Sequence, residues 1–212
     1  EFVTGLSSRT WRRLISDPHT PLINKAISGQ YAPGSTFKMV VALAALEAKI
    51  VGPDHRVFCR GHTQLGNARF HCWKRHGHGH LTMVQALQQS CDVYFYDLAG
   101  RVGVNRIGAM ARRFGLGGSL GIDIPGERSG LIPSREWKQA VKGVRWQKGE
   151  TLITGIGQGF VLTTPLQLAV MTARIARGDK AVTPRLLRSP SGDQEGGQKP
   201  DIPEFKPLGV DR

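Results

Sequence analysis

Apolar residues recur at helical spacing directly after a Pro-Gly turn, and this is the strongest hydrophobic pattern in the chain. The turn ends the preceding segment, and Ser35 suits the cap or first turn of a helix. We predict a buried helix over residues 35–49, stopped at Gly52. Its apolar positions are Phe37, Val40, Val41, Ala44 and Leu46.

The same periodicity predicts several further helices. They span residues 8–15, 81–90, 93–100, 105–114 and 165–177. Gly115 caps the fourth of them, while Pro165 suits the first position of the last and Gly178 closes it. The chain therefore contains enough amphipathic helix to build a helical core.

Other segments lack helical periodicity. Residues 53–80 are rich in glycine and histidine, and we predict a loop or small hairpin that something must hold together. Residues 117–133 are rich in turn-forming residues and predict irregular structure. Residues 155–163 predict a short strand or turn, and residues 181–183 predict a strand.

Composition and charge narrow the class of protein. The 212 residues are enough for one sizeable domain, and no run of about 18 apolar residues predicts a membrane span. The net charge of +13 comes from 29 Lys and Arg against 16 Asp and Glu, but the basic residues are scattered. We interpret them as a solvated surface, not a nucleic-acid site. The chain starts without methionine, so we expect a piece of a longer protein.

Ser35 and Lys38 form the first candidate chemical pair. Residues three apart on a helix are neighbours, so we expect the lysine amine to reach the serine hydroxyl. A first-turn position and partial burial both favour a neutral amine, which would activate the serine as a nucleophile. The alternative is a capping serine beside a lysine that extends to solvent.

Ser90-Cys91-Asp92 is a second candidate motif, placed where one predicted helix gives way to the next. Its alternative is a polar turn at a helix end. Ser191-Gly192-Asp193 repeats the pattern in the tail, so the tripeptide alone has little weight.

Together, four stretches resemble the transpeptidase domain of class B penicillin-binding proteins, and most of all the elongation type, penicillin-binding protein 2. They are residues 31–38, 77–81, 89–96 and 155–167, in that order. The resemblance implies an α/β (α+β) fold, with helices packed on an antiparallel sheet that is only partly present here.

The resemblance also implies roles for the motif residues. It makes Ser35 the acylated nucleophile, Lys38 the general base and Ser90 the proton shuttle, while Asp92 stands where many relatives have asparagine. The implied reaction is peptidoglycan cross-linking through a serine acyl-enzyme that β-lactams also form, with one oxyanion donor being the backbone N–H of Ser35.

Cofactor, partners and location follow from the same resemblance. It implies no cofactor for catalysis, stem peptides and β-lactams as ligands, and no nucleic acid. It also implies a membrane glycan polymerase that pairs with a missing N-terminal part. The domain is expected in the periplasm, anchored to a bacterial inner membrane.

One departure concerns the family's third motif, Lys-Thr-Gly or Lys-Ser-Gly on a strand lining the site. Arg128-Ser129-Gly130 mimics it, but precedes the Gly-Gln-Gly segment that the family places before the motif. We predict a partial transpeptidase domain over residues 1–188. Residues 189–212 are predicted to be a low-complexity loop leading to the missing strand.

The three cysteines allow two hypotheses. One is a Cys59–Cys72 disulfide with Cys91 free and buried, and the other is a structural zinc site formed by Cys59, Cys72, His78 and Cys91. Some elongation-type relatives are thought to carry a metal near this position. We expect four other histidines to be surface residues, namely His62, His71, His76 and His80.

Two alternative functions stay open at this point. A β-lactamase or β-lactam sensor of the same fold also uses Ser-x-x-Lys. A basic Cys/His zinc module that binds nucleic acid would instead show salt-dependent binding and no covalent labelling by penicillin.

Overall fold

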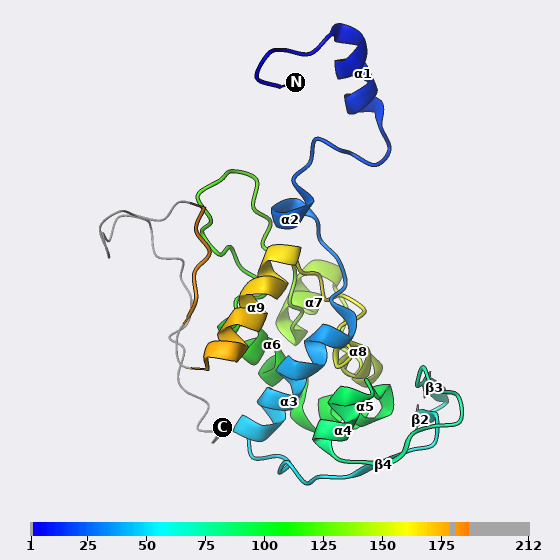
Figure 1. Ribbon diagram of the computed structural model, residues 1–212. Coiled ribbons are helices and arrows are strands. Elements are labelled where there is room, and N and C mark those ends of the chain that lie inside the picture. Colours follow the sequence, from blue (N-terminus) through cyan, green and yellow to red (C-terminus); the bar gives the residue numbers. More distant parts are fainter. Residues whose placement is uncertain (1, 179–180, 187–212) are drawn as a thin grey trace.

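The computed structural model describes residues 2–178 and 181–186, which form a body of packed helices flanked by short strands (Figure 1). The helices of the body are α2 (Lys25–Ser28), the 3₁₀ helix η1 (Gly34–Phe37), α3 (Lys38–Glu47), α4 (Met83–Gln88), α5 (Asp92–Val102), α6 (Val104–Arg113), α7 (Arg135–Lys142), α8 (Lys148–Thr154) and α9 (Pro165–Arg177). Within the described ranges, no helix is both long and apolar enough to cross a membrane.

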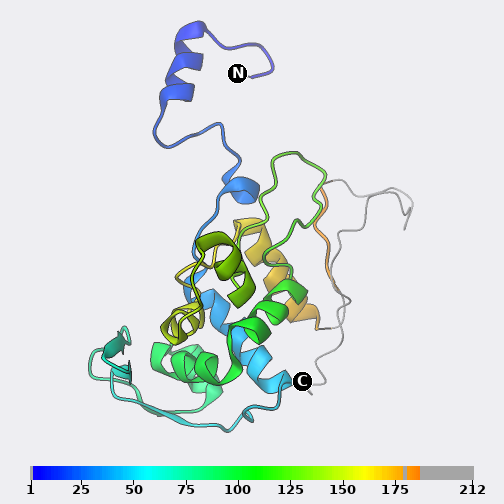
Figure 2. The same ribbon diagram turned by 180° about the vertical axis from the view of Figure 1, so that it is seen from behind.

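The N-terminal helix α1 (Ser8–Ser16) stands away from this body in both views (Figures 1 and 2). Ser7 caps it by accepting a hydrogen bond from the Thr10 N–H, and none of its residues is buried. The predicted helix at residues 8–15 is therefore confirmed, but it adds nothing to the described core.

Helix α3 lies at the centre of the body and packs against α5 and α6. Its sequence is apolar on nearly every side, and Val40, Val41 and Ala45 are fully buried. A helix that is apolar all round needs neighbours on several faces, which α5 and α6 supply. The helix predicted over residues 35–49 is confirmed, except that its first turn is the 3₁₀ helix η1.

Helices α4 and α5 meet at a tight turn around Ser90. Thr82 and Gln85 form a capping box that starts α4, as the side chain of each accepts a hydrogen bond from the other's backbone N–H. Ser90 has a positive φ of 52°, and α5 begins two residues later at Asp92. The two helices predicted here are confirmed, and the turn places Ser90 and Asp92 beside the first turn of α3.

Residues 57–81 form two small antiparallel sheets at the edge of the body. Strand β1 (Val57–Cys59) pairs with β4 (Gly79–Leu81), with Cys59 opposite Gly79. Strand β2 (His62–Leu65) pairs with β3 (Ala68–His71), with His62 opposite His71. The predicted small hairpin is confirmed, with a second strand pair around it.

Helices α7 and α8 are the main elements that the hydrophobic pattern did not predict. Helix α7 is polar, and Lys138 is its one buried residue. The Lys138 ammonium donates hydrogen bonds to Glu150 Oε1 (2.6 Å) and to the Arg145 carbonyl (3.0 Å). An ion pair between Lys138 and Glu150 therefore joins these two short helices.

Helix α9 begins and ends as predicted. Thr164 and Gln167 form its capping box, Pro165 takes the first position, and Gly178 closes it in the left-handed conformation. The strand predicted at residues 181–183 is wrong: the described residues there form no strand, because the Val182 carbonyl instead accepts hydrogen bonds from the buried Arg174 guanidinium. Burial lowers the pKa of Arg174.

Residues 155–163 form turns and join only isolated bridges, Tyr31 to Thr163 and Leu131 to Leu162. Of the two structures predicted for this segment, the turn is correct. Residues 117–133 are irregular, as predicted. The loop predicted over residues 189–212 lies outside the described residues.

Candidate active site

Ser35 lies in η1, on the turn that leads into α3. The Gly34 N–H donates a hydrogen bond to the Gly157 carbonyl at 2.9 Å, so the turn contacts the 155–163 segment through its backbone. A Cβ on Gly157 would come within 2.3 Å of the Gly34 carbonyl oxygen, which shows how closely the two backbones approach. The Ser35 side chain is exposed, while Phe37 and Lys38 behind it are buried.

A series of hydrogen bonds connects Ser35 to Lys38 through Ser90. The Ser90 hydroxyl donates to Ser35 Oγ at 2.7 Å, and the Lys38 ammonium donates to Ser90 Oγ at 3.0 Å. The direct Ser35–Lys38 contact expected from their spacing is not among the hydrogen bonds of the described residues. Ser90 stands between them, so the two side chains communicate through a third hydroxyl.

Lys38 is held from several sides. Its amine also donates to the Ser90 carbonyl (2.9 Å) and to Asp92 Oδ1 (2.7 Å), and its side chain is only 1% exposed. The Phe95 ring centroid lies 5.7 Å from Nζ. The burial expected from the sequence is confirmed, and Asp92 is the charged partner of this amine.

Ser90 occupies a strained backbone conformation. A non-glycine residue at positive φ costs on the order of 1–3 kcal/mol and persists where its surroundings hold it in place. The Ser90 N–H donates to the Leu87 carbonyl (3.2 Å), while the Cys91 N–H donates to the Ala86 carbonyl (2.9 Å). These bonds aim the Ser90 hydroxyl at Ser35.

Trp73 is a site residue that sequence reasoning missed. Its backbone N–H donates to Asp92 Oδ2 at 3.0 Å, and its indole Nε1–H donates to the Gln89 and Ser90 carbonyls at 3.1 Å each. The available signal was its position directly after Cys72, within a loop that had to be held to the body.

The Cys/His group predicted from sequence comes together beside this site. Ligand atoms of Cys59, Cys72, His78 and Cys91 all lie within 4.8 Å of one another. The three thiols are free and buried, and His78 Nδ1 lies 3.6 Å from Cys72 Sγ. Of the other histidines in the region, His71, His76 and His80 are exposed and His62 is half-buried.

The environment of this Cys/His group suits a metal. His78 Nε2 is buried, and no described residue offers it a hydrogen bond. Burial and the nearby Lys74 lower the pKa of His78, which keeps the imidazole in the neutral form that ligates metals. Burial raises the pKa of the Cys91 thiol, and a bound cation would offset that effect by stabilising the thiolate. The residues present therefore fit a tetrahedral zinc ion.

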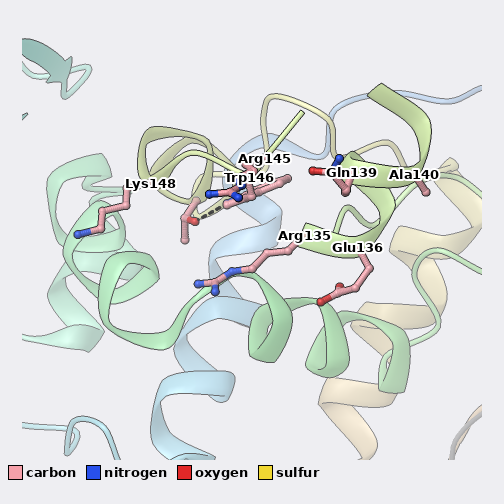
Figure 3. Close-up of a pocket in the computed structure, with 8 residues that line it drawn as sticks. Arg135, Glu136, Gln139, Ala140, Arg145, Trp146 and Lys148 are labelled. Carbon is pink, nitrogen blue, oxygen red and sulfur yellow. Dashed lines mark hydrogen bonds between the residues drawn. The ribbon is translucent and has the colours of Figure 1, made fainter. Parts of the chain in front are cut away.

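A separate pocket of about 820 Å³ lies between α7 and α8 (Figure 3). Its lining residues are Arg135, Glu136, Gln139, Ala140, Arg145, Trp146, Lys148 and Thr151. The Trp146 indole N–H donates to Thr151 Oγ1 at 2.8 Å, which fixes the ring. None of these residues belongs to the group around Ser35.

Ser129, in the segment that mimics a third motif, contacts α9. The Gln167 side-chain amide donates to the Ser129 carbonyl at 2.9 Å. The Arg128 N–H donates to the Ile27 carbonyl in α2. Residues 128–130 therefore tie helices together, and no hydrogen bond connects their described atoms to Ser35 or Lys38.

The family is decided by comparison over almost the whole chain. Residues 5–207 match the family described as penicillin binding protein transpeptidase domain. The chain belongs to this family. It is 38% identical over 208 residues to the peptidoglycan D,D-transpeptidase MrdA of Escherichia coli (strain K12), which covers 97% of this chain and 32% of that protein. The transpeptidase chain thus spans about a third of the length of the curated relatives it matches.

Solved structures of this transpeptidase family agree in fold. Pseudomonas aeruginosa PBP2, solved in complex with WCK 5153, aligns with a TM-score of 0.87 and 42% identity, covering 94% of this chain and 44% of that one. A chain from the solved structure of a peptidoglycan synthase complex that coordinates polymerization and crosslinking aligns with a TM-score of 0.79 and 31% identity. The alignment covers 96% of this chain and 35% of that one. The predicted fold class is confirmed: helices and antiparallel strands of the transpeptidase fold, with a partial sheet.

Proposed function

We propose that this chain carries the acylation site of a peptidoglycan D,D-transpeptidase of the elongation type, with Ser35 as nucleophile, Lys38 as general base and Ser90 as proton shuttle. The observation that carries the proposal is the hydrogen-bonded series from Ser35 through Ser90 to Lys38. A hydroxyl linked to a buried amine is the arrangement that serine acyl transfer requires.

The reaction uses these groups in order. Lys38 acts as a base only after its ammonium has given one proton to water. Ser35 Oγ then attacks the carbonyl of the penultimate D-Ala of a stem peptide, and its proton passes to Ser90 as Ser90 gives its own proton to the Lys38 amine. The tetrahedral intermediate then expels D-Ala, whose amine receives the proton back through Ser90. An amine on a neighbouring stem peptide then attacks the acyl-enzyme carbonyl and loses a proton to Lys38. The ester bond to Ser35 breaks, and Ser35 Oγ regains a proton from Lys38 through Ser90.

Asp92 acts through Lys38 and does not contact the reacting atoms itself. Its Oδ1 accepts from the Lys38 amine at 2.7 Å, which orients the amine toward Ser90. Donors that stabilise the oxyanion complete such a site, and each is worth about 3–4 kcal/mol in related chemistry. We assign one of these donors to the Ser35 backbone N–H.

The test is covalent labelling of the full-length parent protein by a fluorescent penicillin. Ser35→Ala is expected to abolish labelling, and Ser16→Ala on the exposed helix α1 is the matched control that labels normally. Labelling that survives Ser35→Ala contradicts the proposal. Rapid loss of the label by hydrolysis supports the β-lactamase alternative, and salt-dependent nucleic-acid binding without labelling supports the nucleic-acid alternative.

We also propose that Cys59, Cys72, His78 and Cys91 hold a structural zinc ion in place of a Cys59–Cys72 disulfide. The support is the convergence of four ligand atoms within 4.8 Å, with His78 Nδ1 3.6 Å from Cys72 Sγ. Zinc would fasten residues 57–81 to α5 and takes no part in the acyl transfer.

Metal analysis of the purified full-length protein tests the zinc proposal. We expect about one zinc per chain, lost in Cys91→Ser and retained in His76→Ala, an exposed histidine from the same region. A protein without zinc whose mass is two hydrogens lower, with a Cys59–Cys72 cross-link, contradicts the proposal.

For location and partners, we propose a periplasmic domain anchored to a bacterial inner membrane, working with a membrane glycan polymerase. The relative that belongs to a synthase complex for polymerization and crosslinking supports such a partner. The expected ligands are peptidoglycan stem peptides and β-lactams. Affinity purification of the tagged full-length protein from membranes should recover a polymerase, whereas recovery from the cytosol without one contradicts this proposal.

A further inference from the structure

Trp73 combines an exposed ring with inward hydrogen bonds. The residue is 63% exposed, so burial of apolar area gives it little stabilisation. Its backbone N–H and its indole N–H nevertheless both donate to the segment that carries Ser90 and Asp92. The hydrogen bonds, and not the packing of the ring, are what this residue contributes.

The backbone N–H of Trp73 fixes the orientation of a carboxylate. Asp92 Oδ2 accepts from this N–H at 3.0 Å, while Oδ1 accepts from the Lys38 amine at 2.7 Å. Because the two oxygens are bound on different sides, the carboxylate cannot rotate without losing one bond. The Lys38 amine is thereby kept in line with Ser90.

The indole N–H of Trp73 supports the strained turn. The Ser90 carbonyl accepts from Trp73 Nε1 at 3.1 Å and from Lys38 Nζ at 2.9 Å. Ser90 has φ 52°, a conformation that persists only when neighbouring groups hold it. If the indole donor is lost, we expect the turn to relax and the Ser90 hydroxyl to move away from Ser35.

The Cys/His group in turn holds Trp73. The residue follows Cys72 directly in sequence, and its ring lies edge-on to His78 with centroids 5.3 Å apart. Cys91 of the same group sits between Ser90 and Asp92 in the chain. Trp73 is therefore the described side chain that connects this group to the carbonyl of Ser90.

We propose that Trp73 is a positioning residue for acylation: it holds Ser90 and Asp92 in the geometry that passes the Ser35 proton to Lys38. The inference rests on the proposed function. It predicts that a change at Trp73 slows the covalent step while leaving the first, non-covalent binding of the acylating ligand intact.

The experiment compares Trp73→Phe with Trp146→Phe in the full-length protein. Each variant loses one indole N–H donor. The Trp73 donor serves the Gln89 and Ser90 carbonyls, whereas the Trp146 donor serves Thr151 Oγ1 at 2.8 Å, away from the site. Stopped-flow acylation by a chromogenic β-lactam separates the dissociation constant of the first complex from the acylation rate constant. We expect Trp73→Phe to lower the rate constant about threefold to tenfold, with the dissociation constant within about twofold of wild type. Trp146→Phe should change neither.

Rescue provides a second comparison. Trp73→His keeps a ring N–H, and we expect it to recover part of the lost rate constant at a melting temperature matching that of Trp73→Phe. An unchanged rate constant in both Trp73 variants, or a loss confined to the dissociation constant, overturns the positioning role. A wild-type protein that the β-lactam does not acylate overturns the proposed function itself.

Discussion

At the scale of single residues, Asp92 links the buried Lys38 amine to the backbone N–H of Trp73. The carboxylate is 15% exposed and pairs with Lys38, which is 1% exposed. A buried charge that loses its partner is destabilising by about 3–5 kcal/mol, whereas removal of both charges is often tolerated. The same pair that serves the proposed chemistry is therefore expected to affect stability.

We predict that Asp92→Ala lowers the free energy of unfolding by about 3 kcal/mol, because the Lys38 ammonium is left buried and unpaired. The double variant Lys38→Met with Asp92→Ala should lose less than the sum of the two single variants, with a coupling of about 1–3 kcal/mol. Urea unfolding of all four proteins measures this cycle. Strict additivity would show that the pair contributes nothing through its contact.

The positions of the motif residues could be predicted from sequence, but their connections could not. Ser35 and Lys38 are three residues apart, and local helix geometry places them together. Ser90 approaches from more than 50 residues away and comes between them. No local pattern contains that separation, so only the packing of α4 and α5 against α3 reveals it.

At the scale of elements, the turn before α3 depends on a close contact with the 155–163 segment. Gly157 has φ 69°, and an added Cβ would lie 2.3 Å from the Gly34 carbonyl oxygen and 2.7 Å from Phe37 Cβ. Because Gly34 and Phe37 are the two ends of η1, the added Cβ could be accommodated only if η1 moved. The position of Ser35 is thus set partly by a glycine about 120 residues later in the chain.

We predict that Gly157→Ala slows acylation of the full-length protein at least about tenfold and destabilises it by about 2 kcal/mol or more. Gly143→Ala is the matched control, since Gly143 has φ 68° and nothing within 4 Å of its added Cβ. The control should lose only about 1 kcal/mol and acylate normally. Equal acylation rates in the two variants would contradict the proposed role of this contact.

Helices α7 and α8 show why some elements escaped prediction. Both are short and polar, and their junction is an ion pair between Lys138 and Glu150 with side chains 7% and 24% exposed. Helix α7 has eight residues and α8 has seven, which is shorter than the window of about 11–18 residues over which helical periodicity is read, so each gives little signal. By contrast, α9 carries a capping box, Pro165 and Gly178, and its bounds followed directly from sequence.

At the scale of the whole molecule, helix α5 holds the loop and strand region to the body. The Tyr94 hydroxyl donates to the His55 carbonyl (3.0 Å), and the Tyr96 hydroxyl donates to the His71 carbonyl (3.1 Å). Burial raises the pKa of each phenol from the ordinary value of 10.0 to about 12. Each hydroxyl is a donor only while it is protonated.

We predict that stability falls at alkaline pH. The folded state holds these phenol protons more tightly than the unfolded state, so their contribution is complete below pH 10 and is lost as the pH rises through about 12. Tyr96→Phe should cost about 1 kcal/mol near pH 8 and then show a shallower decline. Urea unfolding between pH 8 and 11.5 measures both curves, and parallel curves would contradict the role of Tyr96.

The sequence by itself determined the family, most of the helices and the identity of the motif residues, because caps, turns and helical periodicity are local properties of the chain. Only the tertiary structure decided how those residues connect. It placed Ser90 between Ser35 and Lys38, formed the hydrogen bond from Trp73 to Asp92, and brought the four Cys/His ligand atoms together. These contacts join segments that lie far apart along the chain, and the packing around α3 and α5 is what brings them together.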